Sequence, residues 1–194
     1  MNKKKLLAII TAILVIVVFF IIFYVLATEW SERKVKPLPP LSQDFEQAMV
    51  QFNGAERLMA YLNQYFRIEN RANVNPARGL FAFYAPEEFF QKRRGEKQDF
   101  AILISYVLHR KGYESSILQY QYYVDARNPR VETLVLFRDD APKYFFFQDE
   151  KLILAEYDGI IENLLAAEEE RLNIEILIHH LWPPGFIRLI RQEE

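Results

Sequence analysis

The sequence contains no cysteine and only three histidines among its 194 residues. Without cysteine the chain cannot form a disulfide, a thiolate metal site, a lipid-modified cysteine anchor or a cysteine nucleophile. His109 is isolated and is interpreted as a residue of a helix end, whereas His179 and His180 are adjacent. On a helix that adjacent pair would point about 100° apart, which does not suit one metal ion. We therefore expect neither a metal site nor a bound cofactor.

The chain also lacks the excess of basic residues that a nucleic-acid-binding protein needs. After the first 27 residues, which carry three lysines and no acidic residue, 21 basic and 26 acidic side chains remain. The one basic cluster, Lys92-Arg93-Arg94, is interpreted as a solvated helix end rather than a phosphate site. We expect no nucleic-acid partner.

One long apolar run, Leu6 to Ala27, is interrupted only by Thr11. As a helix it would be ~33 Å long, enough to cross a bilayer, and it has no polar face. A cleaved signal peptide is the alternative, because Val25-x-Ala27 would suit a signal peptidase, but its apolar region is usually only about 7–15 residues long. We predict an uncleaved signal anchor over residues 6–27.

Charges on either side of this run set its orientation. Three lysines lie within residues 1–5, whereas basic and acidic residues are mixed after residue 27, which keeps the amino terminus in the cytoplasm. The chain is then expected to be a single-pass cell-membrane protein whose domain lies outside the cytoplasm. Residues 28–43 form a proline-rich linker, because prolines 37, 39 and 40 hold the backbone extended.

The central element is a glycine-led turn that enters an apolar helix. Gly95 precedes Lys97 and Gln98, and the helix then continues to Gly112, which suits a left-handed cap. Cysteine enzymes place a nucleophile in this way, because free N–H groups and the helix dipole stabilise a thiolate there. In this chain the residues delivered to the first turn are Lys97 and Gln98.

This stretch resembles the signature of the transglutaminase-like superfamily, which has a papain-like fold and reads Gly-x-Cys-x-Asp-(Phe/Tyr)-Ala before a leucine-rich helix. Gly95, Asp99, Phe100 and Ala101 match, and Lys97 stands in place of the catalytic Cys. The resemblance extends over roughly Phe45 to Leu152, including a lead-in helix over residues 85–94. It implies an α+β domain over residues 44–157, with the central helix packed on an antiparallel sheet, in a degenerate member of the superfamily.

Hydrophobic periodicity supports that order of elements. A helical pattern starts at Asp44 and is interrupted near Asn53-Gly54, and alternation then predicts strands over 116–124, 131–138 and 144–148. Residues 158–194 are predicted to be a helical extension that is broken at Trp182-Pro183-Pro184-Gly185.

The resemblance also implies positions for two further site residues. Matching strand to strand puts Glu132 at or near the family His, and Gln148 or Asp149 near the family Asp. With Lys97 for Cys and Glu132 for His, acyl transfer by the family route is lost. Lys97 and Glu132 are expected to form an ion pair rather than a nucleophile and base, because a neighbouring carboxylate favours the ammonium form. Asp99 is expected to accept hydrogen bonds from N–H groups at the helix start.

These observations predict a non-catalytic module that binds an unidentified protein or peptide outside the membrane. Two alternatives remain open. One is a hydrolase or acyltransferase with a non-standard active site that uses Lys97 and Glu132. The other is a subunit of a membrane complex that acts through its transmembrane helix.

Overall fold

A computed structural model of the chain describes residues 38–69, 83–123 and 129–182. The predicted signal anchor at 6–27, the basic end at 1–5 and most of the linker at 28–43 lie outside these residues. In the described part of the chain no helix is long and apolar enough to cross a membrane. The globular unit begins at Pro40.

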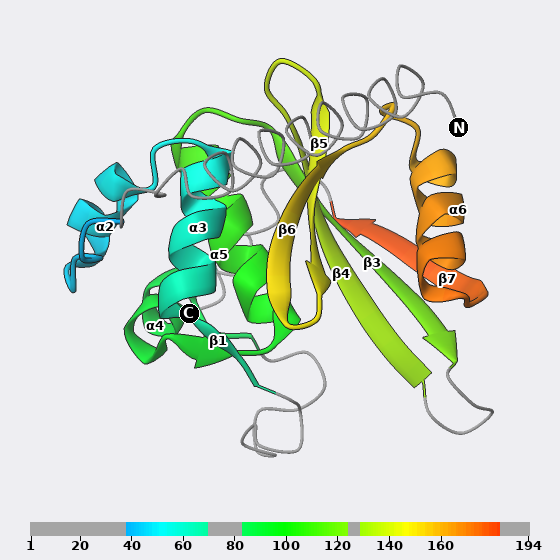
Figure 1. The fold of residues 1–194 in the computed structure, drawn as a ribbon, viewed down its shortest axis with the longest axis horizontal. Coiled ribbons are helices and arrows are strands. Elements are labelled where there is room, and N and C mark those ends of the chain that lie inside the picture. Colours follow the sequence, from blue (N-terminus) through cyan, green and yellow to red (C-terminus); the bar gives the residue numbers. More distant parts are fainter. Residues whose placement is uncertain (1–37, 70–82, 124–128, 183–194) are drawn as a thin grey trace, which may run out of the picture. The chain divides into compact units, whose positions relative to one another are not determined.

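Five helices and two short strands surround one antiparallel sheet in the described ranges (Figure 1). The helices are α2 (Phe45–Gln51), α3 (Ala55–Tyr65), α4 (Pro86–Lys92), α5 (Lys97–Arg110) and α6 (Ile161–Leu172). The short strands β1 (Arg67–Ile68) and β2 (Arg94–Gly95) pair in parallel.

The first two helices follow the predicted pattern. The side chain of Asp44 accepts a hydrogen bond of 2.8 Å from the Gln47 N–H and so caps α2. The predicted interruption separates α2 from α3 at Gly54, whose φ of 92° only glycine adopts readily. The predicted cap at Gly112 is also present, with φ 86°.

The sheet has five strands in the order β6-β5-β4-β3-β7, all neighbours antiparallel. Their bounds are β3 (Ser115–Tyr123), β4 (Pro129–Arg138), β5 (Pro142–Gln148), β6 (Lys151–Glu156) and β7 (Ile176–Trp182). The first three agree with the predicted strands to within a few residues. Thus the α+β class and the antiparallel sheet are confirmed.

Both faces of the sheet are covered by helices, because the strand residues alternate between two apolar layers. On one face, Ala101 and Ile102 of α5 lie beside Ile117 and Thr133, and the Phe100 ring meets Phe147 at 5.4 Å. On the other face, α6 contributes to a core made with β3, β4 and β5. Its buried members are Leu118, Tyr120, Tyr122, Leu134, Leu136, Tyr144, Phe146, Leu164 and Leu165.

The helical extension predicted over 158–194 is present as α6 (Ile161–Leu172), but the prediction is wrong for residues 176–182. The helix α6 ends where Asn173 adopts a left-handed φ of 52°, and residues 176–182 then form β7 beside β3. The physical reason is that Ile-Leu-Ile-His-His-Leu-Trp suits a strand as well as a helix, and pairing with a distant strand decides between them. Both α6 and β7 therefore belong to the domain that was predicted to end at residue 157.

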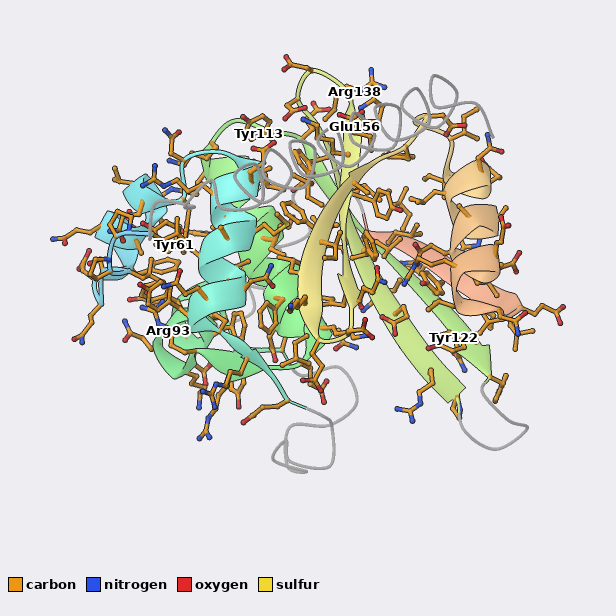
Figure 2. All side chains as sticks on the ribbon, in the orientation of Figure 1. Tyr61, Arg93, Tyr113, Tyr122, Arg138 and Glu156 are labelled. Carbon is orange, nitrogen blue, oxygen red and sulfur yellow. The ribbon has the colours of Figure 1, made fainter. Side chains whose placement is uncertain are left out.

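The basic cluster at 92–94 is not simply a solvated helix end. The Arg93 guanidinium lies 3.7 Å from the Phe90 ring centroid and donates a hydrogen bond of 3.0 Å to the Ser42 carbonyl. Burial lowers the pKa of Arg93. Figure 2 shows Arg93 beside α4, at the same end of the domain as Tyr61 on α3 and away from Tyr122. Arg93 thus fastens the segment before α2 to the helical layer.

Candidate functional site

The start of α5 is fixed by Asp99. This side chain is 3% exposed and accepts hydrogen bonds from the N–H groups of Glu96 at 2.9 Å and Tyr84 at 2.7 Å. A carboxylate in the first turn also interacts favourably with the helix dipole. The role expected for Asp99 is confirmed, and it is structural.

Gly95 is required by packing at the same turn. A Cβ atom at this position would lie 2.6 Å from Asp99 Oδ2 and 2.9 Å from a ring carbon of Phe89. Phe100 is buried among aromatic rings, 4.9 Å from Phe89 between centroids, and Ala101 is 2% exposed. The four residues that match the superfamily signature therefore build the turn and the core beneath it.

Lys97 occupies the first position of α5 and forms the expected ion pair. Its Nζ lies 2.7 Å from Glu132 Oε1 and 2.6 Å from Oε2, so it donates to both carboxylate oxygens. The two side chains are 30% and 14% exposed. The Phe147 ring centroid lies 5.8 Å from the same Nζ. The ammonium is thus held by a carboxylate and covered on one side by a ring.

The ion pair forms where β4 and β5 separate. Their ladder joins only Val135–Arg138 to Pro142–Phe145, although β4 begins six residues earlier and β5 continues to Gln148. Figure 1 shows the two strands diverging beyond this ladder. Glu132 pairs in register with Tyr120 and so belongs to the α6-facing set of residues. Lys97, from the helix on the opposite face, reaches it beside the open part of the ladder.

A polar network continues from Glu132 towards α6. Burial, and next the Glu132 carboxylate, raise the pKa of the Tyr122 hydroxyl. The neighbouring Tyr120 donates a hydrogen bond of 2.6 Å to Glu168 Oε2, and burial followed by this bond raises the pKa of Tyr120. Glu168 is 1% exposed and accepts from Arg171 Nε at 3.0 Å, which raises the pKa of Arg171. Glu132 and Glu168 are thereby each paired with a cation, Lys97 and Arg171.

The other two candidate positions do not join Lys97 and Glu132. Asp149 has φ 48° and, with Glu150 at φ 62°, forms the two-residue turn between β5 and β6. Gln148 pairs across this hairpin with Lys151. Among the described residues, neither Gln148 nor Asp149 forms a hydrogen bond or ion pair with Lys97 or Glu132. The structure therefore brings together two of the four candidate positions.

Sequence reasoning placed Gln98 at the start of α5 but missed the sheet residues that face it, Thr133, Gln119 and Trp182. Gln98, Thr133, Gln119 and Trp182 line a small hollow there, with about 20 Å³ of space, which holds about one water molecule. Trp182 Nε1 donates to Gln119 Oε1 at 3.0 Å, and Gln119 Nε2 lies 3.4 Å from Thr133 Oγ1. The alternation of residues along β4 was the signal that could have identified Thr133. Leu134 and Leu136 face α6, as Glu132 does, so Thr133 between them faces α5.

The two adjacent histidines lie on β7 and not on a helix. They pair with Tyr120 and Gln119 of β3, so their side chains point to opposite faces of the sheet. Within the described ranges no group of three His, Asp or Glu side chains is placed to hold a metal ion.

Comparison of the chain with protein-family models and with curated protein sequences gave no match.

Proposed function

We propose that this chain is a membrane-anchored, non-catalytic member of the transglutaminase-like superfamily that binds a protein or peptide outside the membrane. The observation that carries the proposal is the Lys97–Glu132 ion pair at the start of α5, with both carboxylate oxygens within 2.7 Å of the ammonium. This is the position at which the signature carries its nucleophile. In this chain it holds an internally neutralised pair.

The strands next to the helix start support the same reading. The family His would stand at Glu132 or at its neighbour Thr133, which faces α5, and neither side chain can act as the imidazole does. Thr133 is 2% exposed, and the hollow beside it has room for about one water molecule. The matching residues Gly95, Asp99 and Phe100 serve packing and capping, which a protein keeps when it no longer performs catalysis.

The enzyme alternative needs Lys97 as a nucleophilic amine. An amine attacks through a lone pair, whereas the Lys97 Nζ is engaged as a donor to both oxygens of the Glu132 carboxylate. Under that alternative, Lys97→Ala abolishes a turnover of amide or peptide substrates that the wild-type protein shows. Under our proposal neither protein turns over such substrates.

The partner is expected to contact the rim of the old cleft, because the Asp99 cap fixes the backbone at the start of α5 and a hydrogen bond joins the neighbouring Trp182 and Gln119 side chains. A rigid surface loses little conformational entropy when it binds. The anchor predicted at 6–27 would hold this rim near other membrane and envelope proteins.

Site-specific photo-cross-linking in intact cells tests this proposal. A photoreactive amino acid at Gln98, on the rim, should give a discrete adduct with another protein. The matched control is the same amino acid at Glu56, which is exposed on α3, and it should give no such adduct. Equal labelling at both positions, or none at Gln98 while the protein is present and folded, would count against a binding role for this cleft.

A further inference from the structure

The edge strand β7 is the most exposed apolar element in the described part of the domain. It pairs with β3 on one side only and ends the sheet order, at the right of the view in Figure 1. Leu177, Ile178 and Leu181 are 50%, 65% and 39% exposed. The strand Ile176–Trp182 contains no Lys, Arg, Asp or Glu. Natural sheets usually protect an edge with charges, proline or a covering element, because free N–H and C=O groups recruit another strand.

The opposite edge of the same sheet is protected in that way. The Asn63 side chain of α3 accepts a hydrogen bond of 2.8 Å from the Leu152 N–H and donates one of 2.8 Å to the Leu152 carbonyl. An amide side chain thus occupies the backbone groups of β6 that a neighbouring strand would use. Charged Lys151 and Glu156 stand at the two ends of β6. Of the two edges of the five-stranded sheet, β7 is the one that no side chain of the described residues occupies in this way.

We infer that β7 pairs with β7 of a second copy of this chain, antiparallel and around a two-fold axis at His179. The strand is self-complementary about this residue. In that register Leu177 lies opposite the second copy's Leu181, and Ile178 lies opposite its His180. The three central pairs keep their side chains on one face, because β7 is regular from Ile178 to Trp182, whereas Leu177 stands at the irregularity where β7 shifts its register against β3.

Charge and symmetry favour a second copy over a foreign strand. Neither copy of β7 brings a Lys, Arg, Asp or Glu side chain to the contact, and the exposed apolar side chains of Ile178 and Leu181 would be covered there. Because each sheet has one open edge and one blocked edge, the contact uses the same surface on both copies and closes as a dimer instead of growing into a fibre. The result is a continuous ten-stranded sheet, built from five strands of each copy.

Disulfide trapping tests the register directly, because the chain has no cysteine of its own. In the full chain in detergent, His179→Cys places two thiols across the axis, at a Cα separation of about 4.5–5.5 Å that permits a disulfide. Mild oxidation should then yield a covalent dimer. The matched control is Leu177→Cys on the same strand. Its two copies would lie four positions apart, about 13 Å, and should not cross-link.

The mass of the unmodified chain gives an independent readout. Sedimentation equilibrium in density-matched detergent should give twice the chain mass of 23.1 kDa. Ile178→Lys places a charge on the edge and should return the protein to a monomer. Ile160→Lys makes the same change at a site 50% exposed before α6 and should leave the dimer intact.

Two results would overturn the inference. One is a monomeric mass for the wild-type chain at every concentration reached. The strand that pairs with β7 would then have to come from another protein or from residues 183–194. The other is cross-linking of Leu177→Cys as efficient as that of His179→Cys, which would refute the two-fold register at His179.

Discussion

Gly95 and Asp99 are two halves of one packing contact, and this contact explains why the turn before α5 needs glycine. The missing Cβ leaves space for a carboxylate that caps two backbone N–H groups. A larger residue at 95 would displace the cap as well as the Phe89 ring. The signature residues are therefore read as requirements of the fold, separate from any chemistry.

Gly95→Ala should lower the free energy of unfolding by about 1–3 kcal/mol, because the new methyl group overlaps Asp99 and Phe89. Urea denaturation followed by circular dichroism measures the change. The control is Val50→Ala, at a side chain 73% exposed on α2, which should stay within about 0.5 kcal/mol. Equal, small effects of both substitutions would show that the turn relaxes around a side chain.

The Lys97–Glu132 contact should carry a measurable pairwise energy. A double-mutant cycle with Lys97→Met and Glu132→Gln is expected to give a coupling of about 1 kcal/mol in the free energy of unfolding. The control is the exposed pair Arg110–Glu46, with side chains 45% and 63% exposed, for which about 0.5 kcal/mol or less is expected, falling further in high salt. A coupling at Lys97 no larger than the control would argue that the pair contributes nothing to closing the site.

At the scale of elements, the separation of β4 from β5 lets a helix on one face of the sheet contact a carboxylate that belongs to the other. From Glu132 the polar contacts continue to Tyr122, and from Tyr120 to Glu168 on α6. The network links α5, the sheet and α6 through groups that are partly or fully withdrawn from water. Charges in such a setting are costly to leave unpaired.

Because of the buried tyrosines of this network, we predict that the free energy of unfolding falls at alkaline pH. The folded-state pKa of Tyr120 and Tyr122 is raised, mainly by burial. Folding therefore favours the protonated hydroxyls: the stability is fully present below the unfolded tyrosine pKa of about 10 and falls as the pH rises above it. Urea midpoints measured on both sides of this value should show the fall.

Tyr120→Phe should make this alkaline fall shallower and cost about 1 kcal/mol at neutral pH, because Glu168 loses a donor. Tyr123→Phe, at a side chain 45% exposed, serves as the matched control and should leave the pH profile unchanged. A wild-type profile that is flat through the tyrosine range would contradict the burial of these hydroxyls.

Across the whole molecule, sequence patterns predicted the helices and strands that interactions between neighbouring residues determine. Helical spacing and Gly112 located α5, and two-residue periodicity located β3, β4 and β5. The strand β7 was not predicted, because its apolar residues fit either period and its partner β3 lies more than fifty positions earlier. Similarly β6 was missed, since Asp149 and Glu150 lack the glycine that usually marks a two-residue hairpin turn.

The candidate site shows the same limit. The pairing of Lys97 with Glu132, 35 positions apart, followed from the superfamily resemblance and opposite charges. The parity that turns Thr133 towards α5 and Glu132 away from it depends on strand register, which a sequence pattern leaves open by a residue or two. The partial separation of β4 and β5, which permits the ion pair, leaves no signal in the sequence.

The most direct test of a closed, non-catalytic site is the amine reactivity of Lys97, measured in competition with the other lysines of the same molecule. The full chain is treated briefly with an amine-acylating reagent at neutral pH, and labelled lysines are mapped by mass spectrometry. We predict that Lys97 is acylated more slowly than the exposed Lys111 and that Glu132→Gln removes the difference. Fastest labelling at Lys97 in the wild-type chain would identify a nucleophilic amine and contradict this account.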